Sequence, residues 1–155
     1  MATVQKSVLV PYRAEQMFDL VDGVEAYPKF LPWCSAATIL KRAAQETLAR
    51  LDINYHGVRA HFTTANRRTR PERIVIELRD GPFRRLDGIW LFRALGTAGS
   101  KVELEMHYEF ATSALERLIG PVFSHIANSF IDAFVRRAEQ LHGGVDGPDP
   151  ASSRR

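Results

Sequence analysis

Alternating apolar and polar residues dominate the centre of the chain. Over residues 101–110 every second side chain is apolar, from Val102 to Phe110, and the residues between them are charged or polar. A period of two places the apolar set on one face of a strand and the polar set on the other. The same pattern, or an apolar run on both parities, predicts strands at residues 4–10, 33–41, 49–55, 58–64, 74–78, 86–95 and 101–110.

Short segments rich in turn-forming residues separate these strands. They are Tyr55-His56-Gly57, Arg70-Pro71-Glu72, Asp80-Gly81-Pro82 and Gly96-Thr97-Ala98-Gly99-Ser100. Connections of this length join antiparallel neighbours, because a parallel crossover needs about a dozen residues or more. The sequence therefore predicts an antiparallel meander.

Two helical patterns flank the strands. The first has apolar residues at helical spacing from Ala14 to Val21 and ends before Gly23, and the second begins at Pro121, a favourable first-turn position, and runs to Leu141. A sheet with one apolar face must be covered, and this long helix is the element that can cover it. We therefore expect an α+β, helix-grip fold in which a curved, seven-stranded antiparallel sheet wraps around the C-terminal helix, with room for an apolar ligand between them.

Composition supports one globular domain. The 155 residues are 45% hydrophobic and 25% charged, with a single cysteine, Cys34, so an internal disulfide is excluded. We expect a domain over residues 1–143 and a disordered tail over residues 144–155, which are rich in Gly, Pro and Ser. The chain has no run of about 18 apolar residues, and its first ten residues lack the core of a signal peptide, so we expect a cytoplasmic protein.

Positive charge is concentrated in the middle of the chain. The net charge is +3, but the segment from Arg59 to Arg93 holds nine arginines and four acidic residues. This segment could face a phosphate-rich partner, or it could be an ordinary solvated sheet face. The arginines proposed to contact RNA or another anion are Arg67, Arg68, Arg70, Arg73, Arg84 and Arg85.

Catalytic and metal-binding motifs are not found. The five histidines are dispersed, and H-E-x-x-H, C-x-x-C and G-x-S-x-G do not occur. His125 is a candidate to face a cavity, and Cys34 is best explained as a packed core residue. Aromatic residues occur in nearly every predicted element, which fits either an ordinary core or a cavity for a planar hydrophobic ligand. We expect a binding protein with no metal and no catalytic residue.

Two segments resemble a known family. The first is Tyr27-Pro28-Lys29-Phe30-Leu31-Pro32-Trp33-Cys34, and the second runs from the Asp80-Gly81-Pro82-Phe83 turn to Phe92 and includes Trp90. Both resemble the coenzyme Q-binding and RatA-like branch of the START (helix-grip, SRPBCC or polyketide cyclase-like) superfamily, over about residues 3–143. The resemblance implies the helix-grip fold reached above from the pattern.

The resemblance implies two activities. One is non-catalytic binding of ubiquinone or another polyprenyl quinone, which supports respiratory electron transfer and would involve peripheral contact with the inner membrane for ligand exchange. The other is the activity of a RatA-type toxin, which binds the large ribosomal subunit and blocks its association with the small one. A polyketide cyclase or aromatase shares the fold, but no acid–base pair supports that reading. The oligomeric state is left open.

The quinone reading is taken as the main one, with no cofactor other than the carried ligand. Lys29 is placed at the entrance, where it would meet a quinone oxygen. The residues expected to line the cavity are Tyr27, Lys29, Phe30, Trp33, Tyr55, Phe62, Trp90, Phe92, Met106, Tyr108, Ile126 and Phe130.

Overall fold

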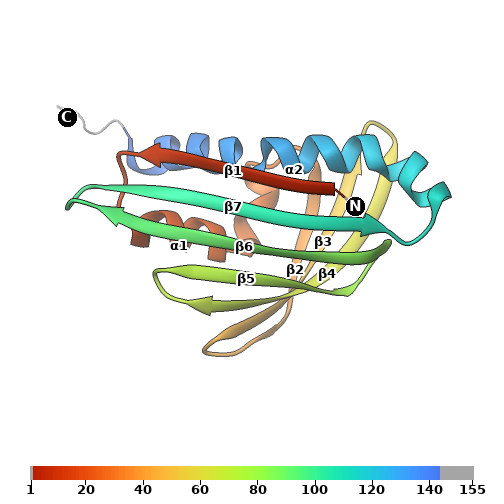
Figure 1. Ribbon diagram of the computed structural model, residues 1–155, viewed down its shortest axis with the longest axis horizontal. Coiled ribbons are helices and arrows are strands. Elements are labelled where there is room, and N and C mark those ends of the chain that lie inside the picture. Colours follow the sequence, from red (N-terminus) through yellow and green to blue (C-terminus); the bar gives the residue numbers. More distant parts are fainter. Residues whose placement is uncertain (1, 144–155) are drawn as a thin grey trace.

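A seven-stranded antiparallel sheet and a long C-terminal helix make up the fold, as predicted (Figure 1). The computed structural model describes residues 2–143; Met1 and the predicted tail, residues 144–155, lie outside the described residues. The strands are β1 (Ala2–Val10), β2 (Cys34–Arg42), β3 (Glu46–Tyr55), β4 (Val58–Thr69), β5 (Arg73–Asp80), β6 (Phe83–Leu95) and β7 (Gly99–Phe110). The helices are α1 (Ala14–Asp22), the short 3-10 helix η1 (Val24–Lys29) and α2 (Ser113–His142).

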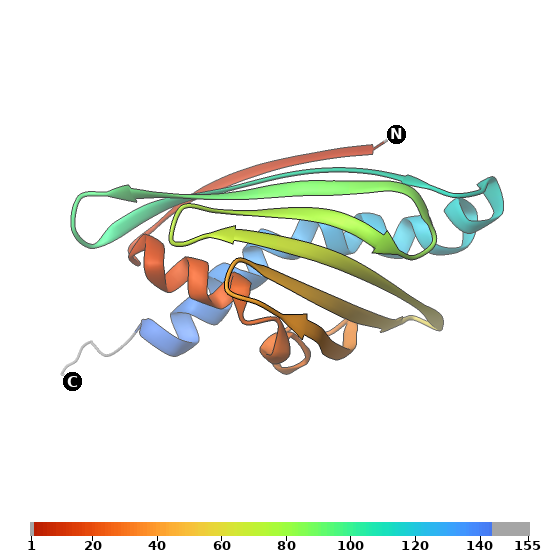
Figure 2. The ribbon, with the colours of Figure 1, turned by 90° about the horizontal axis from the view of Figure 1, so that it is seen from below.

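The strand order is β1-β7-β6-β5-β4-β3-β2, and every pair of neighbours is antiparallel. Strands β2 to β7 form the expected meander, whereas β1 lies at the opposite edge from β2. The chain therefore crosses from one edge of the sheet to the other through α1 and η1. Figure 2 shows α1, η1 and α2 together on the concave side of the curved sheet.

Helix α2 begins earlier than the sequence suggested. It starts at Ser113, because the hydroxyl of Thr112 accepts a hydrogen bond from the backbone N–H of Leu115 (3.1 Å) and caps the helix. Pro121 lies inside the helix and not in its first turn. It leaves the carbonyl of Arg117 without a helical partner, and the exposed position of both residues allows water to take that place.

By length and composition, α2 could also cross a membrane, and it is the one helix among residues 2–143 that could. In the structure, however, 44% of its apolar window is buried inside the protein. The core helix of a globular protein passes the same test, so the finding gives no separate support for a membrane span.

Strand β4 is also longer than predicted, since it continues past residue 64 to Thr69. The extension carries Asn66 and Arg68 on the concave face and Arg67 on the convex face, as the alternation of a strand requires. Polar residues on both faces hide the period of two, so the pattern of apolar positions ends before the strand does.

The core forms where α2 fills the concave face of the sheet. Phe130 lies between two tryptophans, with ring centroids 5.8 Å from Trp33 and 5.8 Å from Trp90. One helical turn further on, Phe134 is fully buried against Trp90 and Tyr27. This contact between helix and sheet is what the predicted grip requires.

Candidate functional site

A small cavity lies between α2, the concave face of the sheet and the α1–η1 segment. Its volume is about 50 Å³, whereas ligand pockets usually measure about 300–1,000 Å³. The cavity therefore has room for a few water-sized groups and not for a quinone ring. The residues predicted for the cavity that do line it are Tyr27, Trp33, Phe62, Trp90, Met106, Ile126 and Phe130.

The other predicted residues do not line the cavity. Phe92 packs between α1 and the sheet, with its ring 5.4 Å from Phe18, and Tyr108 packs 4.8 Å from Phe123. Phe30 is half-buried beside Phe134, and Lys29 is exposed at the end of η1.

Tyr55 lies at the end of the β3–β4 hairpin and stacks on His125 of α2. The sequence analysis named His125 as a candidate to face a cavity. In the structure His125 is exposed and does not line the cavity.

Polar groups at one end of the cavity were missed by the sequence analysis. Asp22, Thr64 and Asn66 line this end, and the hydroxyl of Thr64 donates a hydrogen bond to Oδ1 of Asn66 (2.8 Å). The signal was present in the sequence, because residues 64 and 66 continue the inward parity of Phe62. The hydroxyl and the amide can orient a polar ligand group but cannot supply a general acid or base, and the carboxylate of Asp22 is already in an ion pair with Arg68 (3.0 Å).

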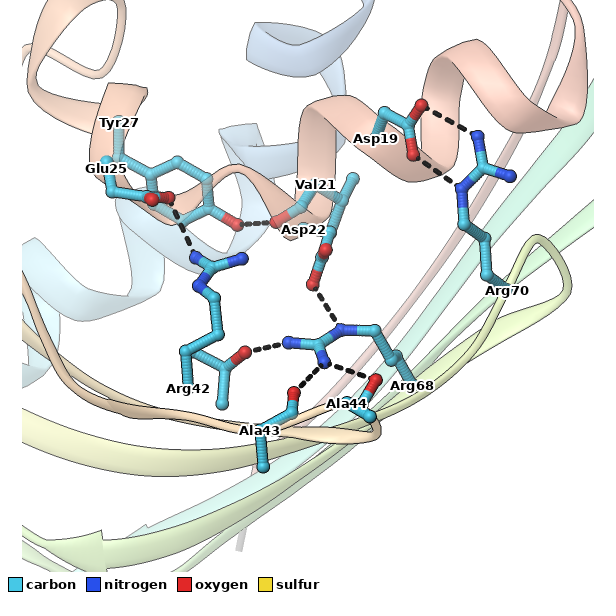
Figure 3. A network of polar contacts seen from close by, with 11 residues as sticks. Asp19, Val21, Asp22, Glu25, Tyr27, Arg42, Ala43, Ala44, Arg68 and Arg70 are labelled. Atoms are coloured by element: carbon cyan, nitrogen blue, oxygen red, sulfur yellow. Dashed lines mark hydrogen bonds and ion pairs between the residues drawn. The ribbon is translucent and has the colours of Figure 1, made fainter.

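Three ion pairs fasten the α1–η1 segment to the strands beside the cavity (Figure 3). The acidic partners recur every third residue, at Asp19, Asp22 and Glu25. They pair with arginines of the β4 end and of β2: Asp19 with Arg70 (2.9 Å), Asp22 with Arg68 (3.0 Å) and Glu25 with Arg42 (3.0 Å). We call this set of six residues the ion-pair clasp.

Arg68 is the most enclosed member of the clasp. Its side chain is 11% exposed and that of Asp22 is 21% exposed, whereas the Asp19–Arg70 pair lies largely in water. The guanidinium also donates to the carbonyls of Ala43 (2.7 Å) and Ala44 (2.9 Å) and to the hydroxyl of Thr47. One side chain thus joins α1, the β2–β3 connection and β4.

Tyr27 fixes the other side of the same segment. Its hydroxyl donates a 2.5 Å hydrogen bond to the carbonyl of Val21, at the end of α1. Burial raises the pKa of Tyr27 well above its usual range, and the nearby carboxylate of Asp22 adds to the shift. The hydroxyl therefore stays protonated and keeps its role as a donor.

The six arginines proposed to contact an anion do not form one basic patch. Arg67 and Arg68 face opposite sides of the sheet, and the ion pairs of Arg68 and Arg70 turn these two side chains toward α1. Three others are paired on or near the sheet: Arg67 with Glu77 (3.4 Å), Arg84 with Glu109 (3.0 Å) and Arg85 with Asp87 (2.7 Å). Arg73 is exposed, and no acidic partner lies within ion-pair distance of it among residues 2–143.

The cavity carries no constellation suited to covalent or metal chemistry. Within residues 2–143, no group of three or more histidine, cysteine or acidic side chains could hold a metal ion. Cys34 is buried, and burial raises the pKa of its thiol to about 11, so the unreactive thiol form prevails near neutral pH. The arrangement is suited to packing and binding.

Known proteins resemble this chain in sequence and in fold. Residues 10–135 match the family described as "Polyketide cyclase / dehydrase and lipid transport". The "Ribosome association toxin RatA" of Pseudomonas aeruginosa is 39% identical over 140 residues, which cover 90% of this chain and 97% of that protein. The "Coenzyme Q-binding protein COQ10 homolog B, mitochondrial" of Xenopus laevis is 23% identical over 96% of this chain and 63% of that protein.

A solved structure supports the same assignment. The solution structure of the 18 kDa protein CC1736 from Caulobacter crescentus is 30% identical, with a TM-score of 0.71 over 92% of this chain and 99% of that one. The fold match and the sequence match, each over about nine-tenths of this chain, agree with one another. The chain belongs to the START-like polyketide cyclase and lipid transport family, on its RatA-like branch.

Proposed function

We propose that this protein acts in the cytoplasm by associating with the large ribosomal subunit and blocking its union with the small subunit, without catalysing a reaction. The observation that carries the proposal is the match, at 39% identity and over 97% of its length, to a relative named for ribosome association. The match runs along the whole domain and is not confined to one motif, which supports carrying the function named for that relative over to this chain. The cavity of about 50 Å³ supports the same reading, because the space for a carried ligand is small.

Sedimentation through sucrose gradients tests this proposal. The purified protein is mixed with separated ribosomal subunits, and each fraction is assayed for the protein. We expect it to travel with the large subunit at about 50 mM salt and to be released as salt rises toward 200 mM, because contacts with RNA phosphates displace counterions. Absence from the large-subunit fractions at about 50 mM salt would contradict the proposal.

Quinone binding is the second candidate function. The cavity is lined by Trp33 and Trp90 and carries hydroxyl and amide groups at one end, and the distant Xenopus relative is named for coenzyme Q. Such a ligand would need the α1–η1 segment to move away from the sheet, and it would have to be exchanged with a membrane. This function therefore requires a conformational change that ribosome association does not.

Tryptophan fluorescence separates the two candidates. Both tryptophans line the cavity, so a quinone held there would quench most of the emission. We expect titration with a short-chain ubiquinone to leave the fluorescence unchanged after correction for absorbance, because the ring does not fit. Saturable quenching at one quinone per protein would instead support the carrier function.

A further inference from the structure

A stack of rings is exposed where the β3–β4 hairpin meets α2, away from the cavity. The rings of Tyr55 and His125 are parallel to within 4°, with centroids 5.6 Å apart, and His56 meets Tyr55 edge-on at 4.2 Å. Tyr55 is half-buried, and both histidines are exposed. In Figure 1 this hairpin, drawn in yellow, rises beside α2.

The backbone of the hairpin holds the stack in place. His56 and Gly57 both have positive φ values, of 51° and 79°, as in the tight two-residue turns that suit hairpins. Histidine adopts this conformation more often than most residues other than glycine, so His56 fits the turn. The turn brings His56 against Tyr55, and α2 supplies His125 from the other side.

His125 is the exposed end of the stack. Tyr55 is the only ring in contact with His125 among residues 2–143, and the histidine is exposed to solvent. Flat aromatic and imidazole faces are the surfaces on which proteins stack unpaired nucleobases. A base that stacks on His125 would become the next ring after Tyr55 and His125.

Each of the two elements that form the stack carries an arginine without an ion-pair partner in the described part of the chain. Arg59 lies at the start of β4, opposite Asn54 of β3, and Arg117 lies on α2 eight residues before His125, about 12 Å along the helix axis. Both are exposed, and neither is in an ion pair within the described part of the chain. Most of the arginines that the sequence suggested for RNA contact are, in contrast, held in ion pairs.

A shallow depression on the outer side of the hairpin adds hydrogen-bonding groups. It measures about 230 Å³ and is lined in part by Asn54, Arg59 and His61. Asp52 lines it too, but its carboxylate is paired with Arg50 at 3.0 Å. The tip of the hairpin thus offers rings on one face and donors on the other.

We propose that the Tyr55–His125 stack is a docking site for an unpaired RNA base, with Arg59 and Arg117 contacting the adjacent phosphates. The inference rests on the proposed association with the ribosome and assigns the contact to the β3–β4 hairpin and the neighbouring face of α2. It moves the RNA-binding surface away from the paired arginines of β4 and β6.

Substitution of His125 tests the stack without touching the core. Binding is measured by fluorescence anisotropy with a fluorescein-labelled, uridine-rich 12-nucleotide RNA, and by sedimentation with purified large subunits. We expect His125→Ala to weaken RNA binding about 5- to 100-fold, because one stacked base is lost. His125→Phe keeps a flat ring and should stay within about twofold of the wild type. Asn128→Ala, an exposed change one turn along α2, is the matched control and should bind normally.

The outcomes separate the two proposals. If the wild type travels with the large subunit but His125→Ala binds both RNA and subunit equally well, the stack is not the docking site and the proposed function stands. Equal losses for His125→Ala and His125→Phe would also overturn the proposal that the stack binds a base.

If the wild type does not travel with the large subunit, the proposed function fails. Binding of the labelled oligonucleotide then decides whether the stack binds RNA. Loss of binding to anionic lipid vesicles in His125→Ala, with RNA binding unchanged, would assign the stack to a membrane and overturn the proposal.

Discussion

The Phe130→Ala variant is expected to lose about 3–5 kcal/mol of unfolding free energy, the range found when a large buried aromatic is truncated. Phe130 is 8% exposed and lines the cavity. Its ring packs against Tyr27 of η1, Trp33, Trp90 and Phe134, so its removal takes away contacts from η1, the sheet and α2 at once.

Urea denaturation followed by circular dichroism measures this loss. Asn128→Ala lies on the exposed side of the same helix and should change stability by no more than about 0.5 kcal/mol. Because the truncation joins new space to the existing cavity, small aromatic compounds should stabilise Phe130→Ala and leave the wild type unaffected. A loss below about 1 kcal/mol would mean that α2 does not pack into the sheet as described.

Arg68→Ala is expected to have the second-largest effect, with a loss of about 2–4 kcal/mol. The substitution leaves the carboxylate of Asp22, two backbone carbonyls and a buried hydroxyl without their donor. Removing one partner of an enclosed ion pair costs more than the pair itself contributes, because the remaining charge has lost part of its hydration.

A comparison within the ion-pair clasp tests this explanation. Arg70→Ala removes a pair that is more than half exposed on both sides, so it should be much less harmful than Arg68→Ala in the same urea experiment. The double variant Asp22→Ala/Arg68→Ala should recover part of the loss, since no unpaired charge remains. Equal effects of Arg68→Ala and Arg70→Ala would show that enclosure of Arg68 does not matter.

The sequence predicts the regular parts of the fold because one physical rule governs them. Alternation over residues 101–110 predicts β7, and in the structure each of its apolar positions from Val102 to Phe110 is buried. The short connections predict the antiparallel meander, since they allow no other pairing. These features depend on local sequence patterns that any sheet with one buried face must show.

Elements stabilised by polar groups could not be predicted in the same way. The inner face of β4 turns polar at Thr64, Asn66 and Arg68 because it meets Asp22 and the end of the cavity there. The ion pair between Asp22 and Arg68 joins residues that are 46 positions apart, so no local sequence pattern predicts it. The start of α2 was misplaced for a similar reason. The helix begins after its cap, the hydroxyl of Thr112, and not at Pro121, where the sequence pattern placed its first turn.

The candidate site was predicted in part for a related reason. Periodicity identifies inward-facing aromatics, and seven of the twelve predicted lining residues do line the cavity. It does not predict how completely they fill the space, because a cavity volume depends on the rotamers and contacts of every neighbouring ring. Two of the arginine ion pairs are likewise set by strand register, which brings Glu77 near Arg67 and Glu109 near Arg84.

The function proposed for this protein is to keep the two ribosomal subunits apart. Light scattering after rapid mixing of small and large subunits reports their union directly, and it can be recorded with increasing amounts of the protein present. We expect the rise in scattering to fall in proportion to the fraction of large subunits that carry the protein, and to be restored when excess large subunit is added. An undiminished rise at a protein concentration that saturates the large subunit would contradict the claim.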